Sequence, residues 1–576
     1  MPHPLPPRPT RDPKDPPRSI DAYFEEAHSS TSGSHHVRLG FWLIFFSLGV
    51  ANSGDATEIG AMNYILSSPG FGEEMLGPSS GDFAGRGAAI ASSVFAGMLI
   101  GGVVTGALGD RTGRRPILLS GLVINATAGA ASAFSPSAAA LCLCRFVGGL
   151  GIGAVLSSLL ALAAELSPPS RRGFCVTFVA SFWSAGQIYV AALAMLLFGE
   201  RGASWRVFAL VAAAPCAVGG VLVWAVVPES ARFLALRGRY GDAARVANVV
   251  ADGMGYRGAA IEAEEVRHHF EAEAANAKPP VTLPRTLSRM QSGLQHTKEA
   301  ARGVRRLYGK DLILRSTLPL QIVWATMSFG SGLCTWITKI FESIDPTSMY
   351  LHSLYFALAN VPGNIAATLL VDRIGRKRLL VVSMMCASLS LFVFADAASD
   401  SSGGKDRPVQ VMLGACIFHA FLVMGWCSIS CMTTELFPTD VRGAGSGICA
   451  ASGRIAAMLV QFVNGALIGR PGMLLSVAAG SIMVGAVAPA AFRVEETGGT
   501  HLHDRTGDGK ATVVMGATAA VSSTEHSHVG HVRRRQITAG GMEITMDGSS
   551  DPIMLKNPAS EVVPSNETDF ASKEIV

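Results

Sequence analysis

Residues 107–118 read ALGDRTGRRPIL, and residues 369–380 read LLVDRIGRKRLL. When the two stretches are aligned without gaps, an aspartate, two arginines and a glycine fall at the same places. A second pair follows in the same order, because residues 164–173 read AELSPPSRRG and residues 434–443 read TELFPTDVRG. Two different motifs that recur in order indicate a chain built from two related halves.

Basic loops alone would produce part of this pattern, because Lys and Arg are enriched in the cytoplasmic loops of membrane proteins. That rule explains the shared arginines. It does not explain the aspartate, glycine, glutamate and proline that the two halves also share. We therefore interpret the two pairs of motifs as an internal repeat.

Long apolar runs surround the repeated motifs. A helix needs about 20 mainly apolar residues to cross a bilayer. Such runs lie in the first half at about 39–66, 88–109, 117–134, 139–166, 173–198 and 205–227. A second set lies at about 312–340, 348–371, 379–395, 409–433, 443–468 and 472–492. The sequence therefore predicts an all-α membrane protein with twelve transmembrane helices in two six-helix bundles.

Composition supports a membrane protein. Of the 576 residues, 49% are hydrophobic and only 16% are charged, whereas soluble domains carry roughly 25% charged residues. The formal net charge of +4 is too small, and the basic residues too dispersed, for a nucleic-acid-binding surface. The ten cysteines lie in or beside apolar runs, so we interpret them as packing residues and expect no zinc site or disulfide framework.

The distribution of charge between loops predicts the orientation of the chain. Arginines and a lysine gather in alternate loops, at Arg111, Arg114, Arg115, Arg171, Arg172, Arg373, Arg376, Lys377, Arg378 and Arg442. The opposite loops are acidic, with Glu73, Glu74, Asp82, Glu200, Glu342, Asp345, Asp396, Asp400 and Asp406. Since basic loops stay in the cytoplasm, we expect both termini and the central loop to be cytoplasmic.

The predicted domains follow from these runs. We expect a six-helix bundle at 39–227, a cytoplasmic central loop at 228–311 with a helical stretch around 240–275, and a second bundle at 312–492. The tails, 1–38 and 493–576, are rich in Pro, Gly, Ser and Thr and poor in large apolar residues. Such segments cannot bury enough apolar surface to fold alone, so we expect both tails to be disordered cytoplasmic segments.

The repeated motifs resemble those of the major facilitator superfamily, and the resemblance extends over roughly residues 39–492. The most specific part is the loop 106–115, GALGDRTGRR. The resemblance implies two bundles that rock around a central solute site. It also implies that this loop latches the cytoplasmic side, with arginines that pair with carboxylates such as Glu165 across a closing interface. The latch residues that we expect are Asp110, Arg111, Gly113, Arg114, Glu165, Arg172, Asp372, Arg373, Arg376, Glu435 and Arg442.

Further motifs resemble the branch that contains sugar porters and organic ion transporters. Residues 228–234 read PESARFL, and Trp205-Arg206 opens the sixth run. The stretches 53–66 and 359–380 resemble most the proteins related to synaptic vesicle glycoprotein 2 and their bacterial aromatic-acid and niacin-type relatives. The seventh run lacks a Gln-rich patch and the tenth lacks a Pro-Trp element, both of which are typical of sugar porters, so a hexose is not favoured.

Ionisable residues inside a span are costly to insert and are therefore candidates for function. Asp55 and Glu58 lie three residues apart on one face of the first run, Arg145 lies in the fourth run and His419 in the tenth. Arg145 could instead tether the bundle, and His419 could be a packing histidine. Uncharged candidates for the lining of a cavity are Gln187, Gln321, Trp324, Trp336, Asn360, Asn364 and Trp426. Glycines such as Gly97, Gly101, Gly149 and Gly153 indicate close helix packing.

In proton-coupled sugar porters, an aspartate and an arginine occupy the places that match Asp55 and Arg145. We therefore predict that these two residues face the cavity and couple transport to protons, with Glu58 as the reserve candidate. A carboxylate that loses its guanidinium partner binds a proton more readily, so a pair that separates as the bundles rock would link proton binding to conformation.

The predicted function is secondary active transport of a small organic ion or related metabolite, coupled to protons, by alternating access. The alternatives are a sensor or vesicle component without net transport, and a sugar transporter. We expect a multi-pass monomer in the plasma membrane or an internal vesicle membrane. Its partners would be a small-molecule substrate, a proton and the lipid bilayer, without nucleic acid, metal, cofactor or enzymatic activity.

Overall fold

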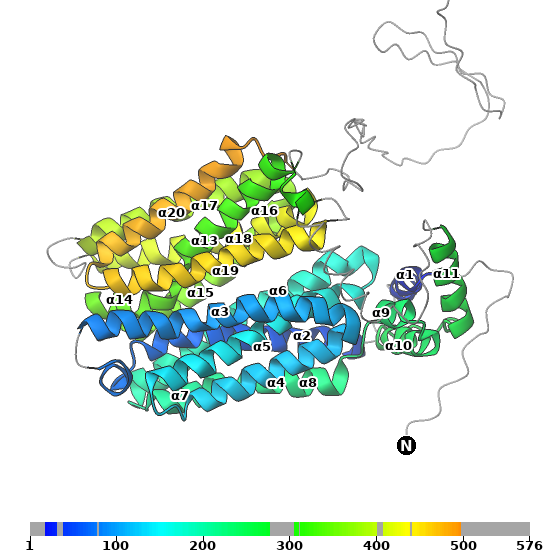
Figure 1. Ribbon diagram of the computed structural model, residues 1–576, viewed down its shortest axis with the longest axis horizontal. Helices are drawn as coiled ribbons and strands as arrows, with labels where there is room; N and C mark the ends of the chain where they lie inside the picture. The colour runs from blue at the N-terminus through cyan, green and yellow to red at the C-terminus, as the bar shows by residue number, and fades with distance from the viewer. Residues whose placement is uncertain are drawn as a thin grey trace, which may run out of the picture. The chain divides into compact units, whose positions relative to one another are not determined.

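The computed structural model describes residues 18–31, 39–77, 80–276, 305–309, 312–399, 407–437 and 441–496. Within these residues every regular element is helical (Figure 1). The N-terminal half contains α2 (Leu39–Ile65), α3 (Ser80–Thr112), α4 (Arg114–Ser132), α5 (Ala138–Glu165), α6 (Arg172–Ala194), α7 (Trp205–Ala212) and α8 (Ala214–Val226). The C-terminal half contains α13 (Leu318–Ser331), α14 (Ile337–Ile344), α15 (Met349–Leu358), α16 (Asn360–Ile374), α17 (Arg376–Ser399), α18 (Pro408–Leu436), α19 (Arg442–Leu467) and α20 (Pro471–Ala491).

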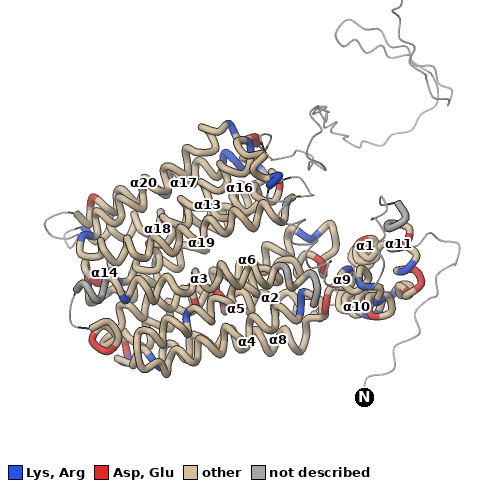
Figure 2. The backbone as a smooth tube through the Cα atoms, viewed as in Figure 1, with Lys and Arg blue, Asp and Glu red and all other residues tan. Residues whose placement is uncertain are grey.

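Charged residues gather at the two ends of these helices, and the middle of each half is mostly uncharged (Figure 2). We call the end with Arg114, Arg172 and Arg376 the basic end, and the end with Glu74 and Asp345 the acidic end. Such a distribution suits a bilayer, because a charge in its hydrocarbon core costs several kcal/mol.

Nine helices among the described residues are long and apolar enough to cross a membrane. They correspond to nine of the twelve predicted spans. The other three predicted spans fall on α2, α4 and the segment α13–α14, which is interrupted by a short 3-10 helix (Gly332–Trp336). Asp55 and Glu58 lower the hydropathy of α2, and Arg114 and Arg115 begin the 19-residue α4. The number twelve therefore stays a prediction.

Close packing in the N-terminal half depends on glycine. A Cβ atom on Gly97 of α3 would lie 2.1 Å from the carbonyl oxygen of Phe146, and one on Gly149 of α5 would lie 2.2 Å from that of Val94. These distances exclude any side chain, so α3 and α5 approach each other through their backbones. The prediction that these glycines serve helix packing is confirmed.

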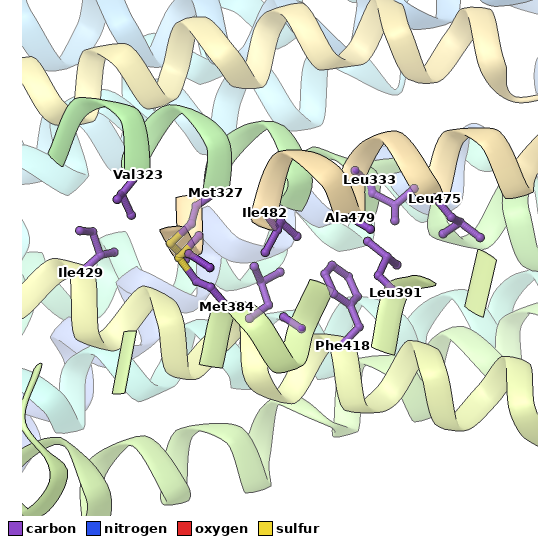
Figure 3. Packing of buried hydrophobic residues seen from close by; sticks show 14 of the residues in the cluster. Val323, Met327, Leu333, Met384, Leu391, Phe418, Ile429, Leu475, Ala479 and Ile482 are labelled. Carbon is purple, nitrogen blue, oxygen red and sulfur yellow. The ribbon is translucent and has the colours of Figure 1, made fainter. Parts of the chain in front are cut away.

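The C-terminal half is built around a separate apolar core. Met327 of α13, Met384 of α17 and Phe418 of α18 are buried together with Leu475 and Ile482 of α20 (Figure 3). These helices therefore pack around a common core of apolar side chains.

Four helices form a small domain at the basic end: α1 (Ile20–Ser30), α9 (Ala231–Leu236), α10 (Tyr240–Gly253) and α11 (Ala263–Asn276). Helix α1 buries Ile20, Tyr23, Phe24 and Ala27 against α10 and the ends of the N-terminal half. Its Tyr23 hydroxyl donates to Asn248 Oδ1 at 2.6 Å. The predicted helical stretch at 240–275 is confirmed in outline, as two helices joined by a loop.

The expectation that residues 1–38 are disordered is wrong for residues 20–30. The composition of the whole tail conceals an apolar pattern at positions 20, 23, 24 and 27, which is the spacing of one helical face. A buried arginine adds to the docking, because Arg18 contacts Glu265 at 3.0 Å and Glu26 at 2.9 Å. Residues 497–576, which contain most of the second predicted tail, lie outside the described residues.

Candidate functional site

The loop between α3 and α4 turns at Gly113, whose φ of 109° favours glycine. The carboxylate of Glu229 lies against this glycine and accepts hydrogen bonds from the backbone nitrogens of Arg114 at 3.1 Å and Arg115 at 3.2 Å. A carboxylate at this place caps the helix and complements its dipole. The residue that follows the last helix of the N-terminal half therefore fixes the start of α4.

The C-terminal half repeats this arrangement. Gly375 has a φ of 95°, and Glu496, which follows α20, accepts from the backbone nitrogens of Lys377 at 3.2 Å and Arg378 at 3.3 Å. The repeat therefore extends to a third element in each half. Sequence reasoning missed the role of Glu496, although the glutamate after the last helix of each half was a visible signal.

The predicted contact of Arg114 with Glu165 is present, and the C-terminal half contains an equivalent ion pair. Arg114 Nε lies 3.7 Å from Glu165 Oε1, and Arg376 Nε lies 3.4 Å from Glu435 Oε1. Each pair joins two helices of the same half. The predicted contact of Arg114 with Glu165 is therefore present, whereas its role as a latch across a closing interface stays a prediction.

Among the other predicted latch residues, the structure describes the side chains of two arginines. Arg172 contacts Asp21 of α1 at 3.0 Å and donates to the carbonyl of Ala164 at 3.0 Å. Arg373 is exposed. The side chains of four further residues fall outside what the structure describes, namely Asp110, Arg111, Asp372 and Arg442.

The predicted charged residues of the first and fourth runs meet inside the N-terminal half. Arg145 Nη1 lies 2.5 Å from Glu58 Oε1, and both side chains are buried. Asp55 is fully buried and accepts a hydrogen bond from Asn125 Nδ2 at 2.9 Å. The partner of Arg145 is therefore Glu58, and the expected pair of Arg145 with Asp55 does not form.

This cluster is incompletely satisfied. Asp55 Oδ2, and Nε and Nη2 of Arg145, are buried without a hydrogen-bond partner among the described residues. Each buried polar atom without a partner costs about 1–3 kcal/mol, and more when it is charged. Such a cost is typical of a site that gains a ligand or a proton in another state.

Most of the predicted uncharged cavity residues are held by their neighbours. Gln187 donates to the carbonyl of Ala56 at 2.9 Å, and Gln321 contacts the hydroxyl of Tyr308 at 3.0 Å, near the basic end. His419 Nδ1 lies 2.7 Å from the carbonyl oxygen of Phe356, and the two rings stack at 4.0 Å.

The remaining predicted residues are also in contact. Asn360 lies 3.5 Å from His419 and donates to the carbonyl of Ala357. Trp324 donates to Thr433 at 2.8 Å and stacks edge-on against Trp426 at 5.3 Å. A solute-binding role for these residues stays a prediction.

Sequence reasoning missed Arg454, which lies near the middle of α19. Its neighbours show which face it occupies: Ala457 and Gln461 are buried, whereas Ile455, Leu459 and Phe462 on the opposite face are at least 47% exposed. Ala457 packs against Val94 of α3, so Arg454 lies on the face turned toward the N-terminal half. An arginine in an apolar run was the signal that could have found it.

Arg454 is half-buried and has no ion pair or hydrogen bond within the described residues. It lies within electrostatic range of Asp55 of α2, in the other half. A guanidinium at this depth costs about 2.5–3.5 kcal/mol unless it is compensated. Arg454 is therefore a cation without an ion pair in one half, and Asp55 is a buried carboxylate within its electrostatic range in the other half.

Contacts between the halves are polar toward the acidic end. Asn63 Oδ1, at the end of α2, accepts from the backbone nitrogen of Thr338 at 2.9 Å. The Tyr350 hydroxyl donates to the carbonyl of Ser67 at 3.0 Å. A third bond lies at mid-span, where Asn364 donates to Ser184 at 2.6 Å.

At the acidic end, the start of α7 is held in place by polar contacts within the N-terminal half. Arg206 forms an ion pair with Glu74 and donates to the carbonyl oxygen of Ala133 at 2.7 Å. The hydrogen bonds from Arg206, and then that from Trp205, hold the pKa of Glu74 below its usual value. This carboxylate therefore stays ionised at neutral pH.

The sequence of the chain is similar to that of several known transporters and related proteins. Residues 57–506 match the family described as "Sugar (and other) transporter". Synaptic vesicle glycoprotein 2C of Rattus norvegicus is 24% identical over 570 residues, which cover 74% of this chain and 75% of that protein. Organic anion transporter 3 of Rattus norvegicus is 26% identical over 382 residues, which cover 65% of this chain and 64% of that protein.

Among solved structures, a partially occluded inward-open conformation of the xylose transporter XylE from E. coli is similar to this chain, with a TM-score of 0.61. The match covers 80% of this chain and 99% of that one, at 17% sequence identity. At that identity, the likeness shows the fold that the two chains share.

Proposed function

The chain belongs to the sugar (and other) transporter family, and from this premise we propose that it is a secondary active transporter of a small organic anion. It is an integral multi-pass membrane protein. In the proposal the halves form two six-helix bundles that rock around a central site, with twelve spans in all. Coupling to protons drives accumulation of the solute.

The observation that carries the choice of an anion is Arg454. A mid-span guanidinium without an ion pair is suited to a carboxylate, because the two groups form charge-assisted, often bidentate hydrogen bonds. A neutral sugar would leave the charge of Arg454 uncompensated. The name of organic anion transporter 3, one of the relatives, agrees with this choice.

The charged groups around Arg454 suggest how a proton could be coupled to the anion. Asp55 and a bound carboxylate would compete for the same guanidinium. When the solute occupies Arg454, Asp55 loses its nearby positive charge and takes up a proton more readily. The anion and the proton would then cross together, while Glu58 keeps the charge of Arg145 compensated.

A thermal-stability screen of the purified chain with organic acids, amines and sugars tests the proposal. A ligand at 100 times its Kd stabilises the folded state by about 2.7 kcal/mol. We expect carboxylic acids to stabilise the wild type. Arg454→Ala should weaken this binding by about 10- to 100-fold, because a hydrogen bond to a charged group contributes about 1.5–3 kcal/mol.

Two further variants make the screen specific. Arg454→Lys keeps the charge but loses the bidentate geometry, so it should give an intermediate affinity. Arg470→Ala removes an exposed arginine just beyond the end of α19 and should leave binding unchanged. Stabilisation of the wild type by sugars alone, or unchanged acid binding in Arg454→Ala, would contradict the proposal.

A further inference from the structure

A polar cavity lies at the basic end, beside the start of α4. It has a volume of about 310 Å³ and lies between the start of α4 and the helices α9 and α10. Three arginines line it, Arg115, Arg239 and Arg245, together with Glu229 and Asp242. The transport proposal does not use this cavity.

The electrostatics of the cavity favour an anion. Glu229 is already occupied, because its carboxylate accepts the backbone hydrogen bonds at the start of α4. Arg115 donates from Nη2 to the carbonyl of Trp224 at 2.7 Å, while its buried Nε has no acceptor among the described residues. Arg115 therefore contributes positive charge to the wall of the cavity without a carboxylate partner among the described residues.

Among the residues that the structure describes, Asp242 is the carboxylate that forms ion pairs with the other two arginines. Asp242 Oδ2 lies 2.7 Å from Arg239 Nη2, and its Oδ1 lies 3.1 Å from Arg245 Nη1. The hydrogen bond from Arg239 lowers the pKa of Asp242, so this carboxylate is ionised at neutral pH. The described lining of the cavity therefore contains three guanidinium groups, two of which share the carboxylate of Asp242.

The position of the cavity indicates where the anion comes from. Arg115 contacts the backbone of Trp224, whose side chain is 69% exposed near the end of α8. Val221 and Val218, one and two turns earlier, are also exposed. An apolar helix face that ends in an exposed tryptophan is typical of the boundary between acyl chains and headgroups.

We propose that this cavity binds the phosphate of an anionic lipid headgroup, while the acyl chains lie along the exposed face of α8. Basic pockets on the cytoplasmic side of membrane proteins suit such headgroups. The phosphate would accept hydrogen bonds from the guanidinium groups of Arg239 and Arg245, and the charge of Arg115 beside it would add to the attraction. Asp242 would compete with the phosphate for Arg239 and Arg245.

Native mass spectrometry of the purified full chain can test this proposal, with phosphatidylinositol 4-phosphate as the probe and phosphatidylcholine as the uncharged comparison. The double variant Arg239→Ala, Arg245→Ala should lower the affinity for the anionic lipid about thirtyfold, since each basic residue near a membrane surface contributes about fivefold. Both side chains are mostly exposed, so the variant should fold.

A variant that binds the anionic lipid more tightly than the wild type would give a sharper test than a loss of affinity. Asp242→Asn removes the competitor and should tighten binding of the anionic lipid several-fold, whereas a purely structural salt bridge would give no such gain. The control Arg257→Ala breaks the exposed pair with Asp252, which lies outside the cavity, and should change nothing.

Two results would overturn the proposal. One is equal retention of phosphatidylinositol 4-phosphate by the wild type and the double variant. The other is displacement of the lipid by an equal concentration of inorganic phosphate, because the cavity would then be a site for soluble phosphate.

Discussion

At the scale of single residues, the interior charges define the proposed chemistry. Arg145 is compensated by Glu58 within one half, while Arg454 and Asp55, from different halves, lie within electrostatic range of each other. Sequence could identify Asp55, Glu58 and Arg145, because any ionisable residue in a span is conspicuous. It could not pair them, since Asp55 and Glu58 share one helix face and small rotations decide which one reaches Arg145.

Replacing each carboxylate separates these roles. Asp55→Asn should abolish uphill accumulation of the solute but leave downhill exchange measurable, because the coupling proton loses its acceptor. Glu58→Gln should instead destabilise the protein, by about 3–5 kcal/mol, because it leaves Arg145 buried and uncompensated. Proteoliposome uptake and thermal unfolding distinguish the two effects. Accumulation by Asp55→Asn in response to an imposed pH gradient would exclude Asp55 as the coupling residue.

At the scale of elements, the loops at the basic end hold the starts of α4 and α17 in the same way. Gly113 with Glu229 and Gly375 with Glu496 form equivalent caps in the two halves. The repeated motif predicted the turn at Gly113 and the contact of Arg114 with Glu165. It could not predict that a glutamate beyond the last helix of each half binds at these turns, because that contact depends on how the helices pack.

We predict that Arg114→Ala and Asp110→Asn slow transport with little loss of solute affinity. This prediction follows from the proposed latch, in which the loop influences the balance between conformations and lies away from the proposed solute site. Initial uptake rates and equilibrium binding, measured on the same preparation, would show the difference. Parallel losses of rate and of affinity would argue against a latch.

Helix α1 allows a second test at this scale. Phe24 is fully buried, so Phe24→Ala should destabilise the docked helix by about 3–5 kcal/mol. Hydrogen exchange in residues 20–30 should accelerate at least about 100-fold. Phe174→Ala, which truncates a phenylalanine that is 56% exposed, is the matched control. Unchanged exchange in Phe24→Ala would show that α1 does not depend on this contact.

At the scale of the whole molecule, the halves are joined by hydrogen bonds toward the acidic end. Asn63 caps the start of α14 from the opposite half, so this cap must break if the acidic end opens. The repeat predicted two halves, but it gave no sign of this contact, because Asn63 and Thr338 lie in non-equivalent parts of the repeat.

Loss of this cap should favour opening of the acidic end. Asn63→Ala should increase the open population about fivefold to tenfold, since a cap contributes about 1 kcal/mol or somewhat more. Tyr350→Phe should act in the same direction. Ser67→Ala is the control, because the carbonyl of Ser67 accepts from Tyr350. Electron–electron resonance between labels at Gly70 and Thr347 would measure the populations, and identical distance distributions in all four proteins would refute the gate.

The most direct test of the account is uptake into proteoliposomes with an imposed pH gradient. The substrates would be the carboxylate that stabilises the chain most and, for comparison, xylose. If the chain transports an organic anion that binds Arg454, the wild type concentrates the carboxylate and Arg454→Ala does not. Neither protein concentrates xylose. Accumulation of xylose without the carboxylate, or full accumulation of the carboxylate by Arg454→Ala, would contradict this account.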